Sequence, residues 1–248
     1  MSKDNNFFTH FGFKNVKMSE KAKLVKDVFD SVSSKYDIMN DVMSMGVHRI
    51  WKHELISMLN PSQTHTLLDV GGGTADIPLS FLRKGGTKCI VVDINYEMLK
   101  EGLKKALNHG YTSSIDFITA DAEHLPFKNE ITPCYSISFC IRNVTNISNA
   151  LLEAYRVLEK GGKFFCLEFS TVNNPILSKA YDAWSFKVIP HIGKYIAKNQ
   201  EAYEYLVESI RKFPPQEEFA NMIRNAGFKN VGFKNLSGGI ATIHYGEK

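Results

Sequence analysis

Glycines and carboxylates gather in one stretch, LLDVGGGTAD at residues 67–76, that could hold a small-molecule ligand. The stretch follows a strand-like run and opens a helical one, so Gly71 and Gly73 would let the backbone turn sharply and approach a ligand closely. Asp69 stands inside the strand, and backbone N–H groups at the start of the next helix would face the ligand. Asp93 ends the next strand-like run, where a carboxylate can accept hydrogen bonds from ribose hydroxyls. This spacing favours a nucleoside-binding site.

A third candidate element is TADAEHLPF at residues 119–127, just after another strand-like run. Asp121 could accept a hydrogen bond from the exocyclic amine of adenine, and the N–H of Ala122 could meet a ring nitrogen. Each element alone has a plainer interpretation: Asp69 could bond a backbone N–H, Asp93 could cap a helix, and 119–127 could be an acidic turn. Their succession at the ends of three strands favours a cofactor site.

Two cofactor classes compete for this site. A dinucleotide loop would read G-x-G-x-x-G, but Asp76 stands at the third glycine position, and the chain has no G-x-x-x-x-G-K-[ST]. Tyr96 and Lys100 form the Y-x-x-x-K pair of short-chain dehydrogenases, but they follow the second strand, far from where that catalytic pair belongs. An acid followed by three glycines suits a ligand with an amino-acid end and no phosphates. We therefore predict S-adenosylmethionine.

The elements that position these residues alternate between strand and helix patterns. Residues 1–60 are interpreted as helices, because apolar side chains recur at helical spacing. From residue 66, short apolar runs separated by helical stripes predict a parallel sheet covered on both faces. A helical stripe near residues 151–158 is expected to stop at Gly161 and Gly162. The expected strands are 66–70, 89–93, 115–119, 135–139, 163–169, 230–236 and 240–245, the last two joined as a hairpin by Ser237, Gly238 and Gly239.

We therefore predict a single α/β domain over residues 1–248 with a doubly wound, mostly parallel, seven-stranded, Rossmann-like sheet. Its expected parts are an N-terminal helical cap (1–60), a cofactor-binding core (61–170), an aromatic-rich helical lid (171–213), and a final helix and hairpin (214–248). The lid and the N-terminal helices would wall a pocket, although such aromatics also serve as ordinary helix-packing core.

The composition sets limits on function. The 248 residues are 44% hydrophobic and 23% charged with a net charge of +4, which is typical of a globular protein and too weakly basic for a nucleic-acid interface. The sequence shows neither a signal peptide nor an apolar run long enough to span a membrane. The four cysteines lack C-x-x-C spacing and are expected to be reduced thiols in a cytoplasmic protein. No His, Cys or Asp cluster has metal-ligand spacing, so no metal is expected.

Further motifs carry a family resemblance that covers nearly the whole chain. They are FDSVSSKYDIMND (29–41), MGVHRIWK (45–52), SFCIRNVT (138–145), ESIRKFP (208–214) and NLSGGI (235–240). With the glycine loop, they resemble the ubiquinone/menaquinone biosynthesis C-methyltransferases, which are class I enzymes that use S-adenosylmethionine. The resemblance implies that Thr74, Asp93, Asp121, Ala122 and Ser138 contact the cofactor. Ala75 and Cys140 stand where the family usually has glycine.

The resemblance also implies methyl transfer to a ring carbon of a prenylated quinol, either a 2-polyprenyl-6-methoxy-1,4-benzoquinol or a demethylmenaquinol. A quinol is needed because its phenolate form pushes electron density onto the adjacent ring carbon. Arg142 would bind this phenolate. The competing interpretation is that Arg142 is a salt-bridge partner. His48 is the first candidate for the general base, with Asp37 as the second. A lone His in a helical region is also often a packing or capping residue.

Other functions and partners stay open. The chain could be a different S-adenosylmethionine-dependent small-molecule methyltransferase, or a non-catalytic scaffold of a quinone-biosynthesis complex. No nucleic-acid partner is expected. Because a prenyl tail resides in the bilayer, we expect peripheral contact with the inner face of a membrane through the mildly basic flanks of the chain. Both rings stay candidates, and the sequence is compatible with an oligomer.

Overall fold

A computed structural model of the chain describes residues 8–32, 40–41, 44–61, 66–172, 184 and 200–248. The N-terminal elements are β1 (Phe8–Phe11), β2 (Lys14–Lys17), α1 (Met18–Val32) and α3 (His48–Leu59). The central elements are β3 (Thr66–Val70), α4 (Asp76–Arg83), β4 (Lys88–Asp93), α5 (Tyr96–Asn108), β5 (Ile115–Thr119), β6 (Thr132–Ser138), the 3-10 turn η2 (Ile141–Asn143), α6 (Ile147–Val157) and β7 (Leu158–Phe169). The C-terminal elements are α9 (Gln200–Lys212), α10 (Gln216–Asn225), β8 (Lys229–Leu236), the turn η4 (Ser237–Gly239) and β9 (Ala241–Glu247).

Seven strands form one mixed sheet in the order β5-β4-β3-β6-β7-β9-β8. Five of these strands, β3 to β7, are parallel, and β9 runs antiparallel between β7 and β8. The doubly wound α/β fold is thus confirmed, with the last two strands as the expected hairpin. The strand order reverses between β3 and β6, and ligands bind outside the carboxyl ends of the strands at such a point.

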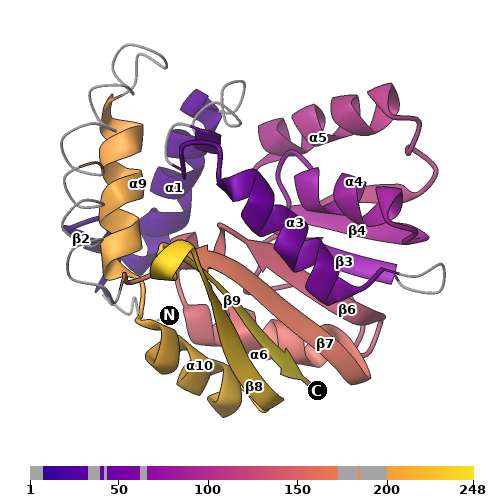
Figure 1. The fold of residues 1–248 in the computed structure, drawn as a ribbon. Helices are drawn as coiled ribbons and strands as arrows, with labels where there is room; N and C mark the ends of the chain where they lie inside the picture. The colour runs from indigo at the N-terminus through magenta and orange to yellow at the C-terminus, as the bar shows by residue number, and fades with distance from the viewer. Residues whose placement is uncertain (1–7, 33–39, 42–43, 62–65, 173–183, 185–199) are drawn as a thin grey trace, which may run out of the picture.

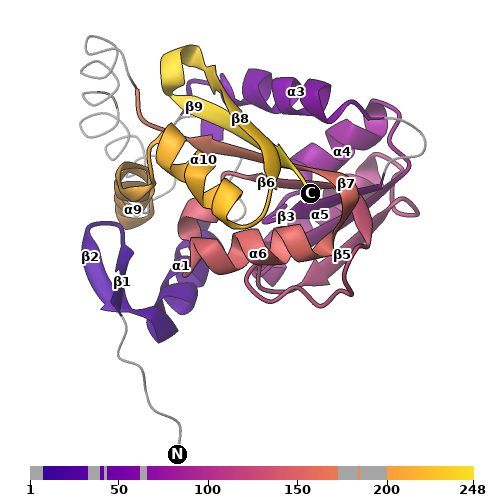
Figure 2. The same cartoon turned by 90° about the horizontal axis from the view of Figure 1, so that it is seen from below.

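Helices cover both faces of this sheet (Figures 1 and 2). On one face lie α3, α4 and α5, and on the other lie α6 and α10. α1, α9 and the β1–β2 hairpin stand together at one end, where α1 contacts both α9 and β1. Residues of α1 and α3 lie at the carboxyl ends of β3, β4 and β6.

The sheet divides two buried cores, which explains why its central strands are apolar on both faces. Leu67 packs into the core that Trp51 and Phe81 share with the α3–α4–α5 layer. Its neighbour Leu68 points the other way, into the core that contains Phe219 under α6 and α10. The alternation follows from the two-residue period of a strand. It fixes the register of β3 and hence the place where the glycine stretch begins.

The N-terminal region differs from the expectation of helices alone. Residues 8–17 form an antiparallel hairpin in which Phe8 pairs with Lys17 and Phe11 with Lys14. The ring of Phe11 stacks on Tyr205 of α9 at 4.2 Å between centroids, so packing against a distant helix supports these short strands. Of the expected lid, only residues 171, 172, 184 and 200–213 lie within the described part of the chain.

The end of α6 is also a correction. We expected the glycine pair at 161–162 to stop this helix, but it ends at Val157. Leu158 already pairs with Thr132 of β6, so the sheet takes up the backbone before the glycines are reached. In the described part of the chain, no helix is both long and apolar enough to cross a membrane.

Candidate functional site

A cavity lies at the carboxyl ends of β3, β4 and β6, where the strand order reverses. Residues from α1 and α3 also contribute to its wall, among them Phe29 and Lys52. The structure brings together at this cavity all eight residues expected to contact a cofactor. They are Asp69, Gly71, Gly73, Thr74, Asp93, Asp121, Ala122 and Ser138.

The glycine turn needs its glycines for space as well as for backbone conformation. Gly71 and Gly73 have φ of 66° and 47°, in the left-handed region that side chains disfavour. A Cβ at Gly71 would overlap the side chain of Cys140, and one at Gly72 would lie 2.7 Å from Oδ2 of Asp69. The turn therefore presents bare backbone to the cavity.

Asp93 links the glycine turn to the next helix. Its Oδ2 accepts a hydrogen bond from the N–H of Gly73 at 3.0 Å, and its Oδ1 accepts one from the N–H of Asn95 at 2.8 Å. Burial raises the pKa of this carboxyl to about 6, although the backbone donors oppose the shift. With the N–H of Ile94 as a third backbone donor, the carboxylate still keeps acceptor capacity for a hydroxyl donor in the cavity.

Asp69 is more deeply buried, with 1% of its surface exposed. The hydroxyl of Ser136 on β6 donates a hydrogen bond to its Oδ1. Burial raises the pKa of Asp69 to about 7, and the negative charge of Asp93 adds to the shift. Two carboxyls with raised pKa in one cavity favour a cationic ligand, because a nearby positive charge would restore their ionised forms.

The third strand end supplies a loop that is fixed by its own hydrogen bonds. Oδ1 of Asp121 accepts from the N–H of Glu123 at 2.9 Å. Oε1 of Glu123 accepts from the N–H groups of Thr145 and Asn146, at 2.7 and 2.9 Å, so it ties this loop to the one after β6. The hydroxyl of Ser138 is enclosed and finds no hydrogen-bond partner among the described residues.

Arg142 is not among the residues that line the cavity, although it contacts one of them, Phe139. The residue is 4% exposed, and its guanidinium donates to Oε1 of Glu168 at 2.7 Å and to the carbonyl of Phe139 at 2.6 Å. Arg142 therefore forms the salt bridge that was expected as the alternative to phenolate binding. Its neighbour Asn143 does line the cavity, and the hydroxyl of Tyr205 on α9 donates to Oδ1 of Asn143 at 2.9 Å.

His48 lines a second cleft, which lies between α3, α4 and α5. Its Nε2 is 2.9 Å from Oδ1 of Asp41. Burial and the charge of Lys52 lower the pKa of this imidazole, against the opposing effect of Asp41. Asp37, the other candidate base, lies outside the described residues.

The sequence analysis assigned no site role to two charged cavity residues, Lys52 and Asp76. Oδ2 of Asp76 accepts from Nζ of Lys52 at 2.7 Å, and Oδ1 accepts from Nζ of Lys105 at 2.8 Å. Burial alone would raise the pKa of Asp76, but the two lysines outweigh it and hold the pKa well below its usual range. The position of Asp76 at the third-glycine place was the only signal, and it did not reveal the lysines.

Comparison with known proteins identifies the family. The sequence model of the ubiE/COQ5 methyltransferase family matches residues 15–248. The chain belongs to this family. One relative is a Dictyostelium discoideum protein named 2-methoxy-6-polyprenyl-1,4-benzoquinol methylase, mitochondrial. The two sequences are 52% identical, and the alignment covers 99% of this chain and 88% of the relative. The chain is 51% identical, over the full length of both chains, to a Roseobacter denitrificans protein named ubiquinone/menaquinone biosynthesis C-methyltransferase UbiE.

Solved structures confirm the fold of a class I methyltransferase. A Thermotoga maritima protein described as a S-adenosylmethionine-dependent methyltransferase, possibly acting on histamine, superposes with a TM-score of 0.64 at 20% identity. That match covers 90% of this chain and 99% of the other. A Methanococcus maripaludis structure described as a methyltransferase of the same cofactor class gives a TM-score of 0.59 at 15% identity, over 100% and 97% of the chains.

The cavity fits the cofactor of this family, S-adenosylmethionine. The bare glycine turn leaves room for its amino-acid end, and the raised pKa values of Asp69 and Asp93 suit its positive charge. The unpartnered hydroxyl of Ser138 offers a further polar contact. No group of three or more potential metal ligands occurs among the described residues.

The two departures from the usual family glycines also have structural explanations. Ala75 adopts φ of 62°, a left-handed conformation in which glycine carries less strain. Its methyl group is fully buried in the core beneath α4. Cys140 fills the space above Gly71 and lines the cavity.

Proposed function

We propose that this protein transfers a methyl group from S-adenosylmethionine to a ring carbon of a prenylated quinol, either a 2-polyprenyl-6-methoxy-1,4-benzoquinol or a demethylmenaquinol. The observation that carries the proposal is the cavity at the strand reversal, with a bare glycine turn and Asp93 on neighbouring strands. Relatives that are about half identical, and aligned over nearly the whole chain, carry the names of such C-methyltransferases.

The cofactor side of the reaction is assigned to the strand ends. Asp93 would accept the ribose hydroxyls, and Asp121 with the N–H of Ala122 would hold the adenine. Gly71, Gly73 and Thr74 would border the amino-acid end, with Asp69 nearby as a carboxylate for its positive charge. When bound, the cofactor supplies an electrophilic methyl group.

The acceptor side is assigned to the loop after β6. Asn143 lines the cavity with its side chain held by Tyr205, so its amide is oriented before any substrate arrives. The Arg142 guanidinium braces the same loop through the carbonyl of Phe139, which supports a positioning role besides the phenolate-binding role. The protein must also hold the ring carbon near ~3–3.5 Å from the methyl group and accept the displaced ring proton. His48 and Asp37 stay the proposed bases for that step.

The proposed substrate also indicates where in the cell the enzyme works. A polyprenyl tail partitions into a bilayer, so the enzyme would work as a cytoplasmic protein that touches the inner face of the membrane. We further propose that the chain associates with itself or with other proteins of a quinone-biosynthesis complex.

The test is methyl transfer from isotopically labelled S-adenosylmethionine to short-tailed quinols. A methoxy-benzoquinol and a demethylnaphthoquinol would be offered anaerobically with reductant, and the products identified by mass spectrometry. We expect label on a ring carbon, and the relative rates would rank the two rings. The Asp93→Asn variant serves as the control with impaired cofactor binding. Cofactor binding without label on either ring would contradict the proposal and favour another acceptor or a scaffold.

A further inference from the structure

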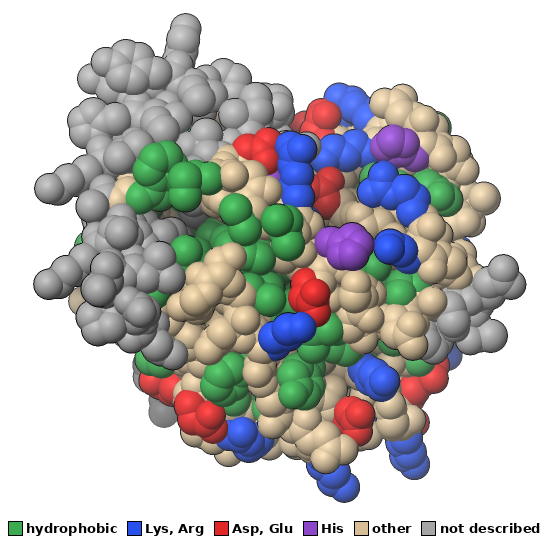
Figure 3. Space-filling model, viewed as in Figure 1, with side chains coloured by type: hydrophobic (Ala, Val, Ile, Leu, Met, Phe, Trp, Pro, Cys, Tyr) green, Lys and Arg blue, Asp and Glu red, His purple; other side chains and the backbone are tan. Residues whose placement is uncertain are grey.

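A second, strongly basic cleft adjoins the cofactor cavity on its outer side. It encloses about 690 Å³ between α3, α4 and α5. The ion pair of Lys52 and Asp76 forms the wall between them, because both residues line both spaces. Figure 3 shows Lys, Arg and His side chains gathered on this part of the surface, over α3, α4 and α5.

The charge of this cleft is mostly positive. Its lining holds five Lys and Arg residues and three His residues, but Asp76 is its only carboxylate among the described residues. Five cations against one anion give +4, which equals the net charge of the whole chain. A concave surface lined by charges of one sign concentrates its electrostatic potential and attracts anions. The cations are Arg49, Lys52, Arg83, Lys84 and Lys105.

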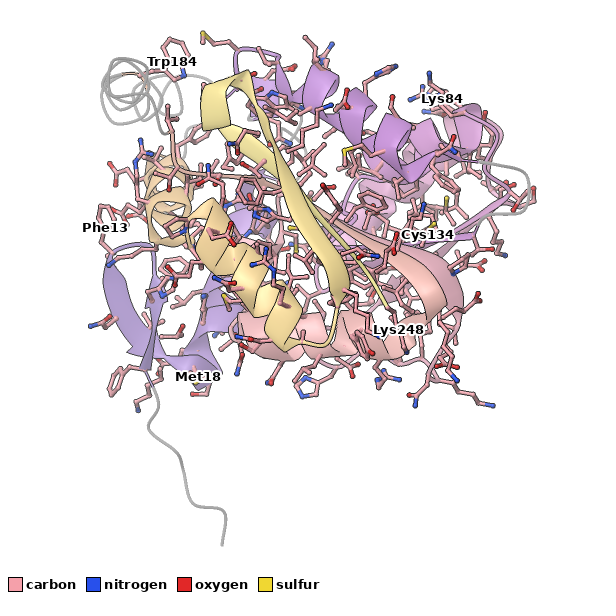
Figure 4. The ribbon with its side chains drawn as sticks, turned by 60° about the horizontal axis from the view of Figure 1, so that its bottom comes forward. Phe13, Met18, Lys84, Cys134, Trp184 and Lys248 are labelled. Atoms are coloured by element: carbon pink, nitrogen blue, oxygen red, sulfur yellow. The ribbon has the colours of Figure 1, made fainter. Side chains whose placement is uncertain are left out.

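Internal ion pairs leave part of this charge uncompensated. Asp76 uses both oxygens on Lys52 and Lys105, and Asp41 accepts from Arg49. Arg83, in contrast, donates to the hydroxyl of Ser80, and no ion pair involves Lys84 in the described part of the chain. Figure 4 labels Lys84 at the outer edge of the molecule. These two cations therefore remain available to an anion from solution, and an Arg fork suits a phosphate in particular.

Apolar side chains stand exposed beside the same cleft. Ile50 is 69% exposed on α3, next to the cleft residue Arg49, and Met45 is 68% exposed in the turn before that helix. Figure 3 shows hydrophobic side chains beside the basic group on this face. A free phosphate ion would make no favourable contact with these apolar side chains. Basic and exposed apolar side chains together match the headgroup and acyl layers of an anionic bilayer.

We propose that this cleft receives the phosphate headgroup of an anionic phospholipid, while Met45 and Ile50 enter the interfacial layer of the membrane. The proposal rests on the proposed function in one respect, because a polyprenyl quinol brings the enzyme to a bilayer. Since one ion pair separates the cleft from the cofactor cavity, a headgroup in the cleft would seat the reaction site beside the membrane surface.

The experiment is vesicle flotation of the full chain without cofactor or quinol. Vesicles of phosphatidylcholine would be compared with vesicles containing phosphatidylglycerol. The Arg83→Gln/Lys84→Gln variant removes two cleft charges outside the cofactor cavity. The matched control is Lys100→Gln/Lys104→Gln on α5, which removes two exposed charges outside the cleft. We expect the wild-type chain to bind only the anionic vesicles, with about tenfold or greater weakening in the cleft variant and little change in the control.

A second pair of variants tests the apolar contact. Ile50→Ser should weaken vesicle binding, whereas Leu152→Ser, which alters a 53% exposed side chain on α6 at the opposite face, should not. Equal losses in the cleft and control variants would overturn the proposal in favour of diffuse charge attraction. Thermal stabilisation by pyrophosphate without any vesicle binding would overturn it in favour of a soluble phosphate ligand.

Methyl transfer to a soluble short-tailed quinol is measured in parallel on the same proteins. The cleft variants should keep this activity, because they touch neither the cavity nor its lining. Vesicle binding by a wild-type chain that methylates neither quinol would contradict the proposed function alone. Methylation without vesicle binding would contradict the membrane site alone.

Discussion

Asp93 gives the cofactor site a defined pH dependence. Its ionised carboxylate is the better acceptor for hydroxyl donors, and its pKa of about 6 places the loss of that form just below neutrality. We expect the affinity for S-adenosylhomocysteine to be roughly tenfold lower at pH 5 than at pH 7, measured by calorimetric titration. Asp93→Asn should bind weakly at both pH values and show a smaller step, because only Asp69, with its pKa of about 7, still titrates in the cavity. A wild-type affinity that is unchanged between pH 7 and pH 5 would contradict the assignment.

Gly71 and Cys140 should be energetically coupled. A Cβ at Gly71 would overlap the Cys140 side chain, so Gly71→Ala should destabilise the fold and weaken cofactor binding. Adding Cys140→Gly removes the overlapping atoms and leaves the nearest one, Cα of residue 140, 3.9 Å away. The double variant should therefore recover part of the loss, although the strain of φ at 66° remains. Urea unfolding of all four proteins measures a coupling on the order of 1–3 kcal/mol, and strictly additive effects would refute the steric explanation.

The sequence predicts individual site residues when these residues lie at the ends of strands. Asp93 and Gly73 were predicted together because the carboxyl ends of neighbouring parallel strands meet at one edge of a sheet. The triad of Asp76 with Lys52 and Lys105 was not, because its members come from three helices whose packing angles no local pattern encodes. The burial of Arg142 against Glu168 is hidden for the same reason, since their contact crosses from a loop to the end of β7.

At the scale of elements, the pair of Arg142 and Glu168 joins η2 to β7. Both side chains are nearly fully buried, so Arg142→Met alone should cost about 3–5 kcal/mol by leaving a buried carboxylate without its partner. Arg142→Met/Glu168→Met removes both charges and should restore much of the stability in urea unfolding. If Arg142 also binds the phenolate, the stable double variant will bind cofactor but lose turnover. Full turnover in the double variant would exclude that catalytic role.

Elements were predictable where their own residues specify them. β3 and β5 coincide with the expected strands, since both are short apolar runs between clear turn signals. β6 ends one residue early because Phe139 turns into a left-handed conformation with φ of 54°. The β1–β2 hairpin was missed because its strands are four residues long and lack an alternating apolar pattern. Contacts with α1 and α9, far away in the sequence, support it.

At the scale of the whole molecule, His244 should make stability depend on pH. It lies buried in β9, where its Nε2 is 2.9 Å from the carbonyl oxygen of Gln216 and its ring packs edge-on against Phe219. Burial lowers its pKa to about 4. Between pH 6.5 and pH 4, His244 is therefore protonated in the unfolded chain but neutral in the folded chain. Stability due to this group is present at neutral pH and is lost as pH falls through that window.

The expected loss is about 2 kcal/mol between pH 7 and pH 5. Urea unfolding of the wild-type chain and of His244→Gln at both pH values isolates it, because the variant keeps a hydrogen-bond donor but cannot titrate. Asp69 and Asp93, whose raised pKa values act in the opposite direction, contribute equally to both proteins. Identical pH dependence in the two proteins would show that His244 is protonated without penalty in the fold.

The thiols have a consequence for chemical durability. Burial raises the pKa of Cys89, Cys134 and Cys166, and also that of Cys140, the one thiol at the cavity wall. A quinol readily oxidises to a quinone, an electrophile that adds to thiolates but far more slowly to protonated thiols. An enzyme that meets quinones throughout its working life would thus escape covalent inactivation at its own reaction site. Cys140 is tolerated at the cavity wall because its thiol stays protonated.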